Sequence, residues 1–132
     1  MSTRTKIRAL LIDPSFQSVR EAFIDGGFES LQEAVGGSIE IAHDFPNGDV
    51  LYVDEDGLAK AHDAMSGRDD ASRAYMFDVG AHQPFAGRGV IVGAEDAEGR
   101  HTDAGMAVGE VKDMVSFIAP AAASAPQGGL PN

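Results

Sequence analysis

The sequence contains no cysteine and no long apolar run. Without cysteine, disulfides, zinc–thiolate sites and thiol nucleophiles are excluded, and the composition is compatible with a reducing cytosol. The apolar run nearest the N-terminus covers only residues 7–12. Because this run is shorter than the core of a signal peptide or a membrane span, we expect a cytoplasmic protein without membrane contact.

Basic side chains are scarce, with 10 lysines and arginines against 21 acids, and the net charge is −11. Such a surface repels phosphate, so direct nucleic-acid binding is not expected. The simplest interpretation of the charge is solubility. A second hypothesis is that the carboxylates imitate duplex phosphates and occupy the DNA-binding groove of a host protein.

The chain of 132 residues, 43% hydrophobic, has the size of one domain with a packed core. We predict a single α+β domain over residues 1–119. Residues 120–132 are rich in alanine, proline and glycine and have no periodic face, so this tail is predicted to be disordered.

The clearest pattern lies between residues 28 and 53. Apolar residues at i, i+3 and i+7 predict a helix over 28–35, and Gly36 ends it because glycine takes the left-handed conformation without a Cβ clash. Alternating apolar residues predict a half-buried strand at 39–42. A Pro-Asn-Gly turn leads from it to a second strand at 50–53.

Weaker patterns complete the expected fold. Residues 15–25 fit either a helix or an imperfect strand that would pair with a first strand at 7–12. The order within 66–86 is not determined. The other expected elements are a helix at 58–65, strands at 74–79 and 89–92, and a helix at 108–118 that Pro120 ends. Together they predict an α+β fold, with a mixed or mainly antiparallel sheet of about five strands and two to three helices packed on one face.

Two segments carry a resemblance to a known family. The first is LQEAVGGSIE at 31–40, followed by a strand and DEDGL at 54–58, and the second is AGRGVIVG at 86–93. Over residues 7–92 the chain resembles the domain of unknown function 3846 family, apart from an insertion-like segment at 65–84. Next to this family pattern we favour the strand at 15–25, paired with the strand at 7–12. Such proteins are small and often encoded by phages, plasmids and bacterial genomes. The family has no established activity, so the resemblance implies no catalytic residues.

Histidine next to aspartate recurs in the sequence, at His43, at His62 and, two residues apart, at His101. A carboxylate that orients a histidine is typical of metal ligands and general bases. No HExxH spacing is present, however, and an acidic chain produces such neighbours by chance. If there is a catalytic site, we expect it near the strand ends, and its candidate residues are His43, Asp54, Glu55 and His82. No metal or other cofactor is predicted.

Two further motifs do not match, one because of its spacing and one because of the element that follows it. From Asp54, the sixth and twelfth residues are Ala59 and Met65 rather than the glycine and glutamate of an EF-hand, so a strand-to-helix turn capped by Asp56 is the better interpretation. The glycines around Arg88 precede a strand, whereas a phosphate loop opens a helix. We expect Arg88 to pair with a nearby carboxylate.

The leading hypothesis is therefore a small acidic accessory protein of mobile-element type that is not an enzyme and acts through protein–protein contact. Its partner would be a protein, with a nucleic-acid-binding host protein as one candidate and a second copy, paired along an uncovered sheet edge, as another. The alternative is a small metal- or nucleotide-dependent enzyme or ligand-binding domain with a His/Asp/Glu site. Two candidate histidines and a carboxylate within about 5 Å in a concave pocket would favour the alternative.

Overall fold

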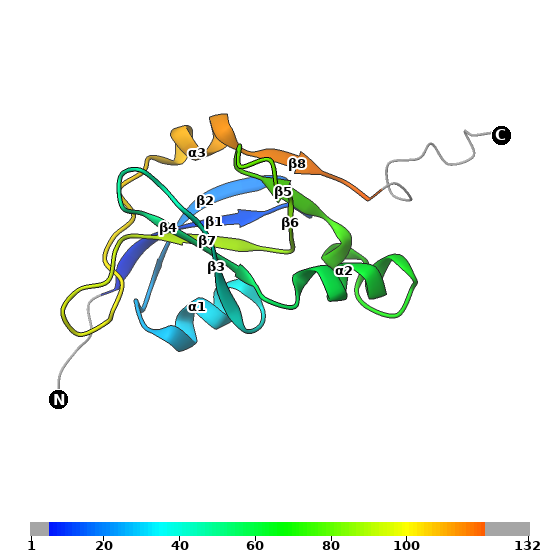
Figure 1. The fold of residues 1–132 in the computed structure, drawn as a ribbon, viewed down its shortest axis with the longest axis horizontal. Helices are drawn as coiled ribbons and strands as arrows, with labels where there is room; N and C mark the ends of the chain where they lie inside the picture. Colours follow the sequence, from blue (N-terminus) through cyan, green and yellow to red (C-terminus); the bar gives the residue numbers. More distant parts are fainter. Residues whose placement is uncertain (1–5, 121–132) are drawn as a thin grey trace.

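Five antiparallel strands form the central sheet in the order β2-β1-β7-β4-β3 (Figure 1). The strands are β1 (Ile7–Asp13), β2 (Ser18–Ile24), β3 (Ile39–Asp44), β4 (Val50–Asp54) and β7 (Gly89–Val92). The structure is a computed structural model that describes residues 6–120. The predicted α+β fold with an antiparallel five-stranded sheet is confirmed.

Both predicted hairpins are present. The ambiguous segment at 15–25 contains β2, which pairs with β1 from Ile7 opposite Ile24 to Asp13 opposite Ser18. The turn between them is tight, because the Gln17 amide donates to the Pro14 carbonyl (3.2 Å). β3 and β4 form the second hairpin, and β7 lies between the two hairpins.

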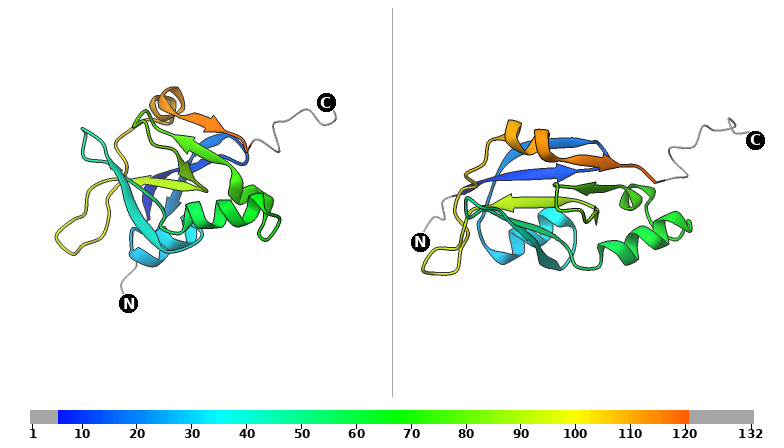
Figure 2. Two further views of the ribbon diagram at one scale, coloured as in Figure 1. Left: turned by 45° about the vertical axis from the view of Figure 1, so that its right-hand side comes forward. Right: turned by 45° about the horizontal axis from the view of Figure 1, so that its top comes forward.

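The two faces of the sheet are covered by different elements. Helix α1 (Phe28–Val35) packs its buried Leu31 and Val35 against Val90 and Val92 of β7 on one face. On the other face, Ile91 packs in a second core with residues of helix α3 (Val108–Met114) and of a smaller sheet. Figures 1 and 2 show α1 on one side of the sheet and α3 on the other. The helices are thus divided between the faces, whereas the sequence predicted one helical layer.

The smaller sheet has three strands in the order β6-β5-β8. It consists of β5 (Met76–Asp78), β6 (Phe85–Ala86) and β8 (Ser116–Ile118). The sequence predicted that the last helix continues to residue 118, which is wrong. α3 ends at Met114, because the following residues pair with β5 and place Phe117 opposite the fully buried Phe77.

Helix α2 (Gly57–Met65) and the 3-10 helix η1 (Ala71–Ala74) lie together beside β6. Asp56 precedes α2, but its side chain does not cap the helix as predicted. Instead, the Asp56 amide donates to Asp54 Oδ1 (2.8 Å), because the turn folds back on the end of β4.

Among residues 6–120, no helix is both long and apolar enough to cross a membrane. Apart from Pro120, the tail predicted to be disordered lies outside the described residues. The boundary of the domain at residue 119 stays a prediction.

Candidate functional site

The four candidate site residues occupy different environments. His43 lies half-buried on β3, where its ring contacts Phe45 edge-on (4.7 Å between centroids). His82 is exposed, with a positive φ of 59°, in the loop between β5 and β6. Asp54 is buried at the end of β4, and Glu55 beside it is exposed. Within residues 6–120, no three histidine, aspartate or glutamate side chains are arranged to hold a metal ion.

Asp54 is the candidate with the most contacts. Its carboxylate is 3% exposed and accepts a hydrogen bond from Lys60 Nζ (2.6 Å). Lys60 Nζ also donates to the Gly36 carbonyl at the end of α1 (3.3 Å). Because a buried charge is costly unless it is paired, this contact joins β4, α1 and α2 at one point.

A cleft of about 650 Å³ opens beside this ion pair. We call it the Arg88 cleft. Its walls come from the β1–β2 turn at residues 13–16, from Asp54 with the first turns of α2, from the η1 region between residues 70 and 75, and from residues 86–88. Of the four candidates predicted from the sequence, only Asp54 lines it. Sequence reasoning missed this cleft, because its walls come from segments that are far apart in the chain.

Glycines allow the segments around the Arg88 cleft to approach one another closely. A Cβ on Gly57 would lie 2.7 Å from the Ala86 carbonyl oxygen, and one on Gly37 would lie 2.8 Å from Asp54 Oδ2. A Cβ on Gly36 would lie 2.7 Å from Arg88 Nη2. The segments 31–40, 54–58 and 86–93, which carry the family resemblance, therefore meet at this cleft.

The His101 ring forms hydrogen bonds with Gly93 and Tyr52 and not with Asp103, the nearby carboxylate that suggested a site in the sequence. Its ring is buried, with Nδ1 2.6 Å from the Gly93 carbonyl and Nε2 2.9 Å from the Tyr52 hydroxyl. Because a carbonyl only accepts, Nδ1 carries the proton, and in the neutral ring Nε2 accepts from Tyr52. Burial is the main cause that raises the pKa of Tyr52, and the negative charges of Glu95 and Asp44 raise this pKa further. The hydrogen bond between Tyr52 and His101 thus holds the segment after β7 against β4.

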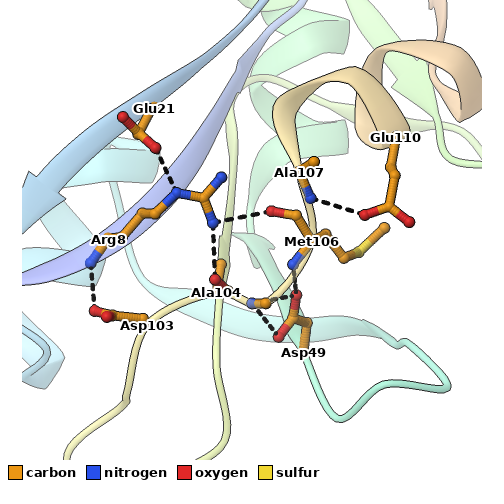
Figure 3. A network of polar contacts seen from close by, with 9 residues as sticks. Arg8, Glu21, Asp49, Asp103, Ala104, Met106, Ala107 and Glu110 are labelled. Atoms are coloured by element: carbon orange, nitrogen blue, oxygen red, sulfur yellow. Dashed lines mark hydrogen bonds and ion pairs between the residues drawn. The ribbon is translucent and has the colours of Figure 1, made fainter.

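A polar network fastens the same segment further along (Figure 3). The buried Asp49 carboxylate accepts hydrogen bonds from the amides of Gly105 (2.9 and 3.0 Å) and Met106 (2.9 Å). From β1, Arg8 Nη1 donates to the carbonyls of Ala104 (2.8 Å) and Met106 (2.9 Å). These contacts hold the loop at residues 104–106 against β1 and the turn before β4, and Arg8 Nε also pairs with the Glu21 carboxylate on β2.

The outer edge of β3 is the second surface with functional potential. Ile39 and Ile41 share one face of this strand because alternate side chains point the same way. Ile39 packs in the α1 core, whereas Ile41 is 57% exposed. Glu29 and Glu33 of α1 line a shallow groove that reaches the start of β3. We call Ile41 with the carboxylates of Glu29, Glu33, Glu40 and Asp44 the acidic edge.

Comparison with known proteins identifies a family. The model of the domain of unknown function family DUF3846 matches residues 7–116. The chain therefore belongs to this family, and the match extends beyond the segments that suggested it. No curated protein and no solved structure is significantly similar to the chain.

Proposed function

We propose that this member of the DUF3846 family is a cytoplasmic accessory protein of mobile-element type that is not an enzyme and binds a basic protein partner along the acidic edge. The observation that carries the proposal is the exposed Ile41 on a strand that ends the sheet. No strand within residues 6–120 pairs with the outer side of β3. Its outward backbone groups are thus available to an extended segment of a partner.

Charge defines the partner. Glu29, Glu33, Glu40 and Asp44 form no ion pair with any basic side chain in the described part of the chain. A basic partner would therefore meet unpaired carboxylates, and the net charge of −11 would steer it during encounter. A host nucleic-acid-binding protein offers such a basic groove.

A second copy of the chain fits this surface less well. Pairing two copies along β3 would bring Glu40 and Asp44 of one copy next to carboxylates of the other, and like charges across a strand pair destabilise it. A bulge between Ile41 and His43 also interrupts the ladder, so side-chain contacts must supply part of the affinity. We therefore propose a basic partner rather than a homodimer.

The test is a competition assay. A labelled DNA duplex is bound to purified basic DNA-binding proteins of a bacterial host, and this protein is added as competitor. We expect it to release the DNA, and its affinity for the host protein should fall steeply as salt rises. Glu29→Lys combined with Glu33→Lys should weaken the affinity by about tenfold or more, because each reversal turns attraction into repulsion.

The matched control is Glu98→Lys combined with Asp113→Lys. It changes the net charge equally, at two exposed positions, one in the loop after β7 and one on α3. Ile41→Ser tests the apolar contact without changing charge. Equal losses in both charge variants would mean that overall charge, and not the acidic edge, governs binding. Binding that is unchanged in high salt would contradict the proposal.

A further inference from the structure

We infer that the Arg88 cleft binds a small ligand that combines a phosphate with an aromatic ring, of the nucleoside monophosphate class. Arg88 and Lys60 hold the phosphate, and Phe16 stacks on the ring. This site is distinct from the acidic edge, and it gives the protein a ligand in addition to its protein partner.

The first observation is where the cations lie. Three of the nine lysines and arginines within residues 6–120 line this one cleft, namely Lys60, Arg73 and Arg88. Arg88 is exposed and forms no ion pair with any carboxylate in the described part of the chain, contrary to the expectation from the sequence. Its guanidinium fork is thus available, and this group binds phosphate through two parallel hydrogen bonds.

Lys60 can add to this contact without leaving its present partners. Its ammonium group has three donors, and two are directed to Asp54 Oδ2 and the Gly36 carbonyl. The third is available to a ligand, and the side chain is 28% exposed. Because Asp54 and Gly36 hold the ammonium in place, little side-chain entropy is lost when an anion binds.

The carboxylates of the cleft are already engaged with donors. Asp13 Oδ1 accepts from the Ser15 amide (3.0 Å) and hydroxyl (2.7 Å), and Asp54 accepts from Lys60. Asp70 accepts from the Ser72 amide (2.9 Å), and this bond lowers the pKa of Asp70. Three basic and three acidic side chains line the cleft, and Arg73 also pairs with Asp69 outside the lining (3.2 Å). In a chain of net charge −11, this lining repels an anion less than the average of the surface does.

The second observation is an aromatic ring at the same cleft. Phe16 is 80% exposed, although it stands on a turn that the Gln17–Pro14 hydrogen bond closes. Tyr75 lines the cleft as well. An exposed ring on a fixed turn offers a stacking surface, and base–aromatic stacking tolerates any base. The volume of about 650 Å³ lies within the range of small-molecule sites.

The test is isothermal titration calorimetry of the full chain at low salt with the four nucleoside monophosphates. The comparison ligands are the nucleosides, ribose 5-phosphate and inorganic phosphate. We expect a nucleotide to bind at least about tenfold more tightly than its nucleoside, which lacks the charge-assisted bonds, and than ribose 5-phosphate, which lacks the ring.

Two variants with matched controls assign the contacts. Arg88→Ala and Phe16→Ala should each weaken nucleotide binding by about tenfold or more. Arg20→Ala and Phe23→Ala remove the same side chains at exposed positions of β2 outside the cleft and should leave the affinity unchanged. All four positions are exposed, so each variant should keep the parent melting curve.

Several outcomes would overturn the inference. They are no heat from any of the four nucleotides at millimolar concentration, an affinity that survives Arg88→Ala, and equal binding of ribose 5-phosphate or inorganic phosphate. A 5′-phosphorylated oligonucleotide carries the same chemistry, and tighter binding of it than of the mononucleotide would assign the cleft to a nucleic-acid end instead. None of these results bears on the acidic edge, whose competition assay uses other residues and another ligand.

Discussion

Asp49→Ala should be among the most damaging single substitutions in this protein. The Asp49 side chain is buried, and its carboxylate accepts from the Gly105 and Met106 amides. Alanine would remove the acceptor and leave both N–H groups of the loop without it. A hydrogen bond to a charged group contributes about 1.5–3 kcal/mol, so the two amides together predict a loss of roughly 3–6 kcal/mol in the free energy of unfolding.

This loss is a large fraction of the stability of a small domain, which is typically about 5–15 kcal/mol. The melting temperature should fall by roughly 10 °C or more. Asp49→Asn should cost less, because the amide oxygen still accepts from one N–H while its NH₂ group faces the other. Asp44→Ala is the control, since it removes an exposed carboxylate at the end of β3, close by in sequence.

Urea unfolding measures the free energies, and hydrogen exchange locates the effect. The amides of Gly105 and Met106 should lose protection before those of the central strand β7. The reasoning is refuted if Asp49→Ala costs no more than Asp44→Ala, or if exchange at these two amides does not change. Either result would mean that the loop keeps its position without the buried carboxylate.

Two further predictions concern a close contact and a raised pKa. Gly89→Ala should destabilise by about 1–3 kcal/mol, because its Cβ would lie 2.7 Å from Cζ of the fully buried Phe77. Gly109→Ala, in α3 where no atom lies near the added Cβ, should stabilise the protein by about 0.5–1 kcal/mol. Urea unfolding measures both variants, and a change of stability in the same direction for Gly89→Ala and Gly109→Ala would contradict this contrast. Since the folded pKa of Tyr52 is raised above 10.0, its contribution to stability is fully present below pH 10.0 and is lost as pH rises through the folded value. The free energy of unfolding should therefore decline above pH 10.0, together with a step in phenolate absorbance, and Tyr52→Phe should reduce this decline. Equal declines in the parent and in Tyr52→Phe would contradict the assignment to Tyr52.

Local patterns predicted the second hairpin, whereas for the first hairpin they also allowed a helix and the family pattern favoured the strand. β1 and β2 were predicted as neighbours, and so were β3 and β4, because a short turn between two apolar strands leaves the chain little choice of partner. The α1 helix and its end at Gly36 follow from periodicity and from the freedom of glycine at positive φ. These features depend on interactions within a window of about 18 residues.

Long-range pairing decided the rest. The stripe at 108–118 has helical spacing throughout, yet its end becomes β8 because β5, about 40 residues earlier, provides a strand edge and a core that receives Phe117. The same pairing fixes β5 within the segment at 66–86, whose conformation the sequence left open. Propensity over three residues is too weak to compete with such tertiary contacts.

The sequence by itself determined the fold class, the hairpins, the family and the acidic character of the chain, since these depend on composition, on local periodicity and on short motifs. Only the tertiary structure placed β7 between the hairpins and divided the helices between two faces. It also brought Arg88 and Lys60, 28 residues apart in the chain, to one cleft and left His43 and His82 outside it. The reason is physical, because a binding site requires groups that are close in space, and the packing of distant segments sets that distance.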